Sequence, residues 1–526
     1  MRITRFPSIR SVCRFRLLLP LVSLVSLTAG LGAQTGDAGG DGGTRREPPS
    51  RGPLRYTSPR GTAALSADLA SQLNSRVRSG SWGAIVVSLT RGDTLFQVNA
   101  DESLVPASTM KLFTTALAFE RLGPTHRFTT TVLRDGDVSA DGTLNGNLIL
   151  KGGGDPALSR RFYKGDANGP MRALARQVAM AGIKRVRGDV IGDDSAFEPK
   201  TVPDGWLSRY LHASYAAPVS ALSLNENLLY VAVRPGQAGT EATVRLEPAT
   251  TAYSVRNSAM TRGGSRGARL TVALGSGNVI NVRGWIGAAS EPRVYIVVVQ
   301  DPATFTTGAF HRALTEAGIR VDGEPRVGRT PPGAKPVTFM PSPPLAELAT
   351  IMNHESINHY AELIFRNIAR ETSPARVGSA AMANALLRDF MMLRVGSPGE
   401  DVFAADGSGL STLDRVTPRS LVHLLAFAHR APWSDTFHST LPVAGRDEML
   451  RTRMRRTPAQ GNLHAKTGTT NEVIALSGYV DTQDGETLAF AFLYNGRDRW
   501  NARETIDAMS ATLAAFTRGP WQDDLR

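Results

Sequence analysis

Residues 106–124 read PASTMKLFTTALAFERLGP, and this stretch predicts a helix that is buried over most of its surface. Its apolar side chains cover too much of a helix of 3.6 residues per turn to form a single surface stripe. Pro106 before the stretch and Gly123-Pro124 after it are typical start and stop signals. Lys111 lies among the apolar positions, and because lysine is rarely buried without a role, it needs a chemical explanation.

Ser108 lies three residues before Lys111, so the two side chains share one helix face, one turn apart. A serine hydroxyl is a weak nucleophile, and a desolvated lysine can be uncharged near pH 7 and take its proton. The backbone N–H groups at the start of the helix can also hold an oxyanion. For a lone Ser-x-x-Lys match, a capping serine and a surface lysine are the favoured interpretation, but here Lys111 lies between Met110 and Leu112 on a helix with little polar surface, which favours the chemical interpretation.

Two further short motifs carry polar side chains. Ser356-Ile357-Asn358 lies on a short connection between two predicted helices, where functional side chains are often displayed, although alone it is more typical of a helix cap. The segment 464–469 (HAKTGT) ends a predicted strand. There Gly468 would let a substrate lie against the strand edge. Lys466 would present a cation, and Thr467 and Thr469 two hydroxyls, to a carboxylate.

In this order, the three motifs resemble those of penicillin-binding proteins and serine β-lactamases, whose Ser-x-x-Lys, Ser-x-Asn and Lys-Thr-Gly elements line one cleft. The long segment between the first two motifs is similar to that of low-molecular-mass penicillin-binding proteins of the D-alanyl-D-alanine carboxypeptidase/endopeptidase family, which have domains inserted there. Four other stretches resemble the same family: GNLILKGGGDPAL (146–158), APVSALSLNEN (217–227), ADGSGLS (405–411) and LPVAGRDEML (441–450).

The resemblance implies catalytic roles for four side chains. Ser108 would attack the carbonyl of the penultimate D-alanine, and Lys111 would accept its proton. Ser356 would relay a proton to the leaving D-alanine amine, with electrostatic support from Lys466. The backbone N–H groups of Ser108 and Thr469 would hold the oxyanion. β-Lactams would acylate Ser108 in the same way.

The resemblance also implies roles in substrate binding. Asn358 would bind the substrate amide, and Thr467 and Thr469 would bind the terminal carboxylate, with Gly468 between them. Ile357 is an apolar residue between Ser356 and Asn358, and we expect it to change the polarity of the pocket without touching the catalytic pair.

The expected fold is of the α/β (α+β) type: a β-lactamase/transpeptidase-like domain with a five-stranded antiparallel sheet flanked by helices, plus inserted β-rich domains. Alternation of apolar residues and turn signals predict the five strands at residues 84–89, 94–98, 463–466, 474–480 and 488–494. The catalytic domain would comprise residues 63–128 and 330–526. Residues 129–329, with many short β-rich runs between glycine turns, would form an inserted region of two small domains.

The beginning of the chain predicts export to the periplasm. Residues 1–33 combine several arginines, an apolar stretch too short to span a membrane and small residues after it, as in a secretory signal peptide. Residues 34–62 are rich in glycine, proline and charge, which predicts a disordered linker. The only cysteine, Cys13, would leave with the signal, so the mature chain would have neither a disulfide nor a thiol nucleophile.

The formal net charge of +13 favours contact with anionic surfaces such as the cell wall. No block of basic residues alternates with aromatic residues, so we expect no nucleic-acid partner, and at most peripheral membrane contact. No cofactor is expected. His354 and His359 are five residues apart and not four, and on a helix that spacing would leave their rings about 140° apart, so they do not match a His-Glu-x-x-His metal site and no metal is expected.

The sequence therefore predicts a serine-type D-alanyl-D-alanine carboxypeptidase that acts on peptidoglycan stem peptides, with endopeptidase activity on cross-links as a second expected activity. One alternative is a β-lactamase or esterase on the same fold, against which the long insertion argues. Another is a non-catalytic wall-binding penicillin-binding protein, which would have no need for three intact motifs. Labelling with penicillin, and the rate at which the label is released, distinguish the three.

Overall fold

A computed structural model of the protein describes residues 55–264 and 266–519. The predicted signal peptide, residues 1–33, and most of the predicted linker lie outside these residues. Among the helices of the described ranges, none is both long and apolar enough to cross a bilayer.

Residues 55–61, the end of the predicted linker, are held against the last part of the chain. Gly61 N donates to Thr517 O at 2.9 Å, and Thr57 N donates to Thr512 Oγ1 at 3.0 Å. The predicted disorder therefore does not extend to these residues. Their polar composition gave no sign of order because their partners lie at the other end of the sequence.

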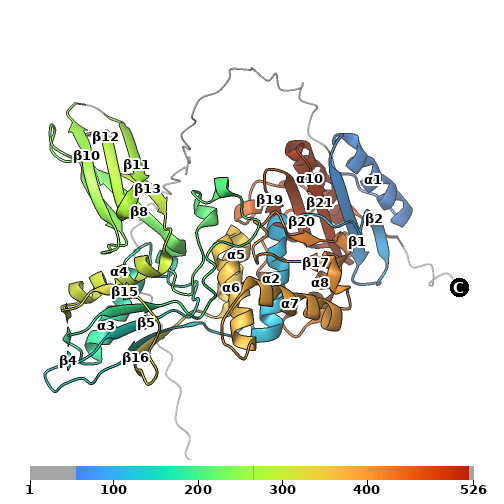
Figure 1. The fold of residues 1–526 in the computed structure, drawn as a ribbon. Coiled ribbons are helices and arrows are strands. Elements are labelled where there is room, and N and C mark those ends of the chain that lie inside the picture. Colours follow the sequence, from blue (N-terminus) through green and yellow to red (C-terminus); the bar gives the residue numbers. More distant parts are fainter. Residues whose placement is uncertain (1–54, 265, 520–526) are drawn as a thin grey trace, which may run out of the picture. The chain divides into compact units, whose positions relative to one another are not determined.

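A five-stranded antiparallel sheet contains strands from both ends of the described chain. In Figure 1 these strands lie side by side. The strand order is β19 (His464–Thr469), β20 (Val473–Asp481), β21 (Thr487–Asn495), β1 (Ser81–Ser88) and β2 (Thr94–Val98). This confirms the predicted sheet and its mixed helical and β setting.

Both faces of the central strand β21 are buried. Leu488, Phe490 and Phe492 pack in the core shared with α1 (Thr62–Ser75) and α10 (Arg499–Ala515). The alternate residues, such as Ala489 and Leu493, lie in the core on the opposite face. Since successive side chains of a strand point to opposite faces, this apolar run places helices on both sides of the sheet.

The helical layer on that opposite face surrounds α2 (Met110–Leu122), in which every residue from Met110 to Phe119 is buried. A 3₁₀ turn, Ala107–Thr109, precedes α2 and carries Ser108. The predicted buried helix is thus confirmed, with a tighter first turn. The other members of this layer are α5 (Leu345–Glu355), α6 (Asn358–Thr372), α7 (Ala380–Phe390), α8 (Pro418–Arg430), α9 (Ser434–Ser439) and the small pair β17 (Val402–Phe403) and β18 (Arg415–Val416).

The chain between α2 and α5 forms further sheets. One has the order β15 (Pro325–Val327), β7 (Val190–Asp193), β5 (Leu148–Lys151), β3 (Thr129–Arg134) and β16 (Lys335–Pro341). A smaller one has the order β14 (Arg320–Val321), β6 (Arg185–Val186) and β4 (Thr143–Leu144), and α3 (Gly169–Met180) and α4 (Pro302–Glu316) belong to the same core. Strand β16 pairs with β3, so this sheet continues past residue 329, where the sequence placed the end of the inserted region.

Two three-stranded sheets complete this part of the chain (Figure 1). Their orders are β13 (Arg293–Val298), β8 (Leu228–Arg234), β9 (Thr243–Glu247), and β10 (Ser254–Arg262), β12 (Val279–Gly287), β11 (Ala268–Leu274). Apolar side chains from both sheets, among them Val231 and Val282, belong to one buried core. The β-rich character predicted for residues 129–329 follows from these strands.

Candidate active site

Ser108 and Lys111 lie in hydrogen-bonding contact. Lys111 Nζ is 3.0 Å from Ser108 Oγ, 2.7 Å from Asn358 Oδ1 and 2.7 Å from the carbonyl oxygen of Ser408. The side chain of Lys111 is fully buried, and this burial lowers the pKa of its amine to about 7. The nearby carboxyl groups of Asp406, Glu362 and Asp414 act in the opposite direction but do not offset the burial.

The partners of Lys111 define how an uncharged amine would be oriented. Such an amine has two N–H groups and one lone pair. Asn358 Oδ1 and the carbonyl of Ser408 can only accept, so they take the two N–H groups and leave the lone pair for the Ser108 hydroxyl. The orientation of the Asn358 amide follows from its other side, where Nδ2 donates to the carbonyl of Tyr215 at 2.9 Å.

Ser356 and Lys466 form a second contact. Lys466 Nζ donates to Ser356 Oγ and to the carbonyl of Thr467, each at 3.0 Å. Lys466 is fully buried, and burial together with the charge of Lys111 holds the pKa of its amine well below its usual range. Ser356 ends α5 with a left-handed backbone (φ 58°), a conformation that directs the chain into α6 and its first residue, Asn358.

Strand β19 packs directly against the turn that carries Ser108. A side chain at Gly468 would lie 2.7 Å from the carbonyl oxygen of Pro106 and 3.3 Å from the Cβ atom of Ala107. Gly468 therefore allows β19 to pack closely against the turn that carries Ser108. The sequence had suggested instead that this glycine makes room for a substrate. Through this contact the Lys-Thr-Gly motif is brought beside the Ser-x-x-Lys motif.

The loop 405–411 supplies the Ser408 carbonyl that accepts from Lys111. In the sequence, this loop was notable only for its resemblance to the family. The carboxylate of Asp406 accepts hydrogen bonds from the backbone N–H groups of Ser408, Gly409 and Ser411 at 2.6 to 2.9 Å. These bonds fix the peptide whose carbonyl accepts from Lys111. The contact between Lys111 and the carbonyl of Ser408 joins residues 297 positions apart, so local spacing could not reveal it.

Two further buried carboxyl groups hold the same loop. Glu362 Oε1 accepts from Gly407 N at 2.8 Å, and burial raises the pKa of the Glu362 carboxyl to about 8. Asp414 Oδ1 accepts from Ala405 N at 2.8 Å, and burial raises the pKa of Asp414 well above its usual range. With a pKa of about 8, the Glu362 carboxyl is mostly protonated at neutral pH.

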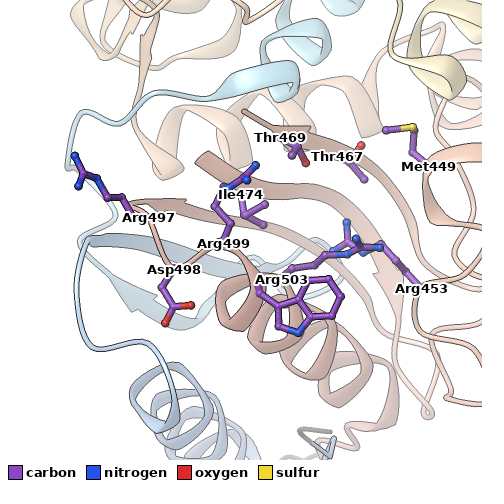
Figure 2. Close-up of a pocket in the computed structure, with 10 residues that line it drawn as sticks. Met449, Arg453, Thr467, Thr469, Ile474, Arg497, Asp498, Arg499 and Arg503 are labelled. Atoms are coloured by element: carbon purple, nitrogen blue, oxygen red, sulfur yellow. The ribbon is translucent and has the colours of Figure 1, made fainter. Parts of the chain in front are cut away.

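Thr467 and Thr469 line a cavity of about 510 Å³ whose other walls are strongly basic (Figure 2). The basic side chains belong to Arg453, Arg497, Arg499 and Arg503, and Trp500 and Met449 add exposed apolar surface. Arg499 Nη1 donates to the carbonyl of Thr470 at 2.8 Å, next to β19. The arginines come from two separate segments, and the sequence analysis did not identify them.

The inserted region also reaches this site. Tyr215 supplies the carbonyl that orients Asn358, and Trp206 Nε1 donates to Asp406 Oδ2 at 2.6 Å. The structure thus brings together all eight side chains or backbone positions singled out in the sequence. His354 lies on α5 and His359 on α6. The described residues contain no group of three or more His, Cys, Asp or Glu side chains that could hold a metal ion.

A serine in contact with a buried lysine, with a second serine and lysine beside them and an antiparallel sheet at their side, is the arrangement of a serine hydrolase of the penicillin-binding class. The chain belongs to the D-Ala-D-Ala carboxypeptidase 3 (S13) family, whose sequence profile matches residues 65–516.

Relatives and a solved structure agree with this assignment. The chain is 33% identical over 451 residues to a D-alanyl-D-alanine carboxypeptidase of Actinomadura sp. (strain R39), covering 82% of this chain and 81% of that protein. It is 26% identical over 437 residues to the D-alanyl-D-alanine carboxypeptidase DacB of Haemophilus influenzae, covering 81% and 88%. The crystal structure of penicillin binding protein 4 from Haemophilus influenzae matches with a TM-score of 0.70 at 23% identity, over 85% of this chain and 98% of that one, and confirms the fold.

Proposed function

We propose that the protein is an exported D-alanyl-D-alanine carboxypeptidase that also cleaves peptide cross-links of peptidoglycan, through an acyl-enzyme on Ser108. The observation that carries the proposal is the amine of Lys111, which is fully buried, has a pKa of about 7 and lies 3.0 Å from Ser108 Oγ. A base with this pKa is half uncharged at neutral pH, as general-base catalysis requires. The names of the relatives supply the substrate class.

The proposed reaction has two steps. Ser108 Oγ bonds to the carbonyl carbon of the penultimate D-alanine while its proton passes to Lys111. The backbone N–H groups of Ser108 and Thr469 stabilise the oxyanion. The C–N bond then breaks, and a proton relayed by Ser356, with Lys466 beside it, reaches the departing amine. Water then attacks the ester and frees the serine.

Substrate binding is assigned to the residues around this centre. Asn358 would bind an amide of the peptide, and Thr467 and Thr469 would bind the terminal carboxylate. The cluster of arginines in the adjoining cavity supports this assignment, since guanidinium groups pair well with carboxylates. In a cross-linked substrate a second stem peptide follows the cleaved bond, and it would extend toward the same cavity.

Labelling with fluorescent penicillin tests the proposal. We expect the parent protein to form a stable covalent adduct and Ser108→Ala to form none, with both proteins showing the same circular dichroism spectrum. No adduct on the parent would favour a non-catalytic wall-binding protein, and rapid release of the label would favour a β-lactamase.

Digestion of intact peptidoglycan by the purified protein tests the two activities. Free D-alanine reports the carboxypeptidase, and a fall in dimeric muropeptides reports the endopeptidase. We expect both products from the parent and neither from Ser108→Ala.

The location and domain division form part of the same proposal. Residues 1–33 would direct export to the periplasm, and residues 63–128 and 330–526 would form the catalytic domain around the inserted region. The β-lactams are expected inhibitors, and the related Haemophilus influenzae protein has been solved in complex with one.

A further inference from the structure

The sheet β10-β12-β11 has one buried and one exposed face. On the inner face, Ala259, Ile280 and Val282 are fully buried in the core shared with the neighbouring sheet. Because side chains alternate across a strand, the residues between them point away from this core. The outer face therefore presents the other half of each strand to solvent.

Strand register gathers arginines on this outer face around one tryptophan. Trp285 on β12 lies opposite Met260 on β10 and opposite Arg269 on β11. The Cζ atom of Arg262 lies 4.5 Å from the centre of the Trp285 ring, over its face. Arg283 lies two residues before Trp285 on the same strand and so on the same face. Trp285 and the exposed Met260 thus form an apolar patch with arginines around it.

Arg256 extends the basic surface by one further step, because it lies on β10 six residues before Arg262 and shares its face. Arg256, Arg269 and Arg283 are all exposed. In the described part of the chain, no carboxylate lies within 4.0 Å of the guanidinium nitrogens of these three residues. Strands lie about 4.8 Å apart and alternate residues about 7 Å apart, so the Cα atom of Arg283 lies roughly 8 Å from that of Arg256 on one side and that of Arg269 on the other.

The segment that contains this sheet is the source of much of the charge of the protein. Residues 228–299 contain eight arginines, no lysine and three acidic residues, a formal charge of +5 out of +13 for the whole chain. Like charges at this density repel one another, so the array disfavours the folded state unless an anion neutralises it. A polymer with regularly spaced anionic groups would neutralise several at once.

We propose that this outer face, hereafter the arginine face, binds the carboxylate groups of polymeric peptidoglycan through Arg256, Arg262, Arg269 and Arg283, with Trp285 at its centre. Guanidinium groups recognise carboxylates by paired hydrogen bonds, and their planar shape suits a flat surface. The choice of polymer rests on the proposed function. If the active site takes peptides of the same polymer, a second contact raises their effective concentration there.

Co-sedimentation with purified insoluble peptidoglycan tests the arginine face in the full chain. The test variant is Arg256→Gln/Arg269→Gln/Arg283→Gln in a Ser108→Ala background, which prevents digestion. The matched control removes the same charge from three exposed arginines on helices outside this sheet: Arg121→Gln, Arg176→Gln and Arg430→Gln. We expect about tenfold weaker binding for the test variant and parental binding for the control, with the parent losing affinity as salt rises.

Chemical amidation of the peptidoglycan carboxylates distinguishes the ligand, and we expect it to abolish the difference between the parent and the test variant. Equal sedimentation of the test variant and the control would overturn the proposal. So would full retention on the amidated polymer, or displacement of the parent by a phosphate polymer or DNA but not by polyglutamate.

A second readout separates this proposal from the proposed function. In the chain with Ser108 intact, the three arginine substitutions should leave hydrolysis of a short soluble D-alanyl-D-alanine peptide unchanged and slow the digestion of insoluble peptidoglycan. Loss of both activities would indicate misfolding, which penicillin labelling of the same variant detects. If the parent lacked peptidase activity but still bound peptidoglycan through the arginine face, only the proposed function would fail.

Discussion

Burial sets the chemistry of Lys111. It lowers the pKa of the amine to about 7, and the amine can accept a proton from Ser108 only when it is uncharged. The reactive fraction therefore rises with pH through this value. We predict that the rate constant for acylation by a chromogenic cephalosporin falls about tenfold per pH unit below about pH 6 and levels off above about pH 8. A stopped-flow rate that stayed constant from pH 5 to 8 would contradict the assignment of Lys111 as the base.

The arginines beside β19 lead to a second prediction at the scale of single residues. Arg499 and Arg503 line the same cavity as Thr467 and Thr469. Within the described residues, neither arginine forms an ion pair. Replacing both by alanine should raise KM for a D-alanyl-D-alanine peptide about tenfold while kcat changes little, because a charge-assisted contact with the terminal carboxylate is lost.

A peptide substrate whose terminal carboxylate is blocked as an amide provides the comparison. Its KM should be nearly the same in the parent and in the Arg499→Ala/Arg503→Ala variant. An equal rise in KM for the free and the blocked peptide would mean that these arginines do not bind the terminal carboxylate. Arg176→Ala/Arg430→Ala removes two exposed arginines from other parts of the chain, on α3 and α8, and serves as the control for net charge.

Sequence could identify the side chains proposed to react but not everything that positions them. Ser108 and Lys111 are one helical turn apart, so local spacing alone predicts their contact. Asp406 and the carbonyl of Ser408 reach Lys111 only through the tertiary fold, and a backbone carbonyl has no signature in the sequence. The arginines of the cavity have no local signature for the same reason, since Arg453 and Arg499 come to line one cavity only when the segment around Arg453 packs on α10, where Arg453 Nε donates to Asp507 Oδ1.

At the scale of elements, the loop 405–411 and the turn at Ser108 fit together at a glycine. Gly409 has a positive φ of 83°, and a Cβ atom there would lie 1.8 Å from the carbonyl oxygen of Ala107. Gly409→Ala should therefore displace the loop or the turn, slowing acylation at least about a hundredfold and costing about 2 kcal/mol or more in stability. Acylation kinetics and thermal unfolding of the purified variant measure the two effects.

Gly485 provides a matched control for this substitution. It has nearly the same φ, 80°, in the turn between β20 and β21, but nothing lies within 4 Å of the position of its Cβ atom. Gly485→Ala should cost only about 1 kcal/mol of backbone strain and leave acylation at the parental rate. If the two variants were acylated equally fast, the close contact between the loop and the turn would not matter for the site.

The predicted elements show where periodicity is informative. The strands of the central sheet were found because their apolar runs end at clear turn signals such as residues 482–485. The end of the inserted region was placed at residue 329, but β16 continues its sheet to Pro341. Strand β16 is an edge strand with mixed exposure, so its sequence carries neither a regular alternation nor an apolar run that would assign it to a sheet.

At the scale of the whole molecule, the inserted region takes part in building the active site. Three of its residues contact the motifs or the loop beneath Lys111: Trp206 donates to Asp406, the carbonyl of Tyr215 accepts from Asn358, and the carbonyl of Asp204 accepts from Ser411 Oγ at 2.7 Å. Local sequence patterns cannot predict these contacts because they span about 140 to 210 positions. The arrangement of the site thus depends on both parts of the chain.

This dependence can be tested by removing one hydrogen bond. Trp206→Phe keeps most of the aromatic surface but deletes the N–H group that donates to Asp406 at 2.6 Å. Asp406 is fully buried, and a buried carboxylate that loses a donor costs about 1.5 to 3 kcal/mol. Since Asp406 fixes the peptide that accepts from Lys111, we predict acylation by penicillin about tenfold slower, together with a lower midpoint of thermal unfolding.

A second tryptophan separates the loss of a hydrogen bond from the loss of catalytic support. Trp433 is 8% exposed, as is Trp206, and its Nε1 lies 3.4 Å from Glu120 Oε2, a contact that involves none of the residues bonded to Lys111. Trp433→Phe should lower the unfolding midpoint while acylation stays at the parental rate. If Trp206→Phe were acylated as fast as Trp433→Phe, the hydrogen bond from Trp206 would stabilise the fold without supporting the base, and the remaining bonds of Asp406 would suffice to hold the loop 405–411.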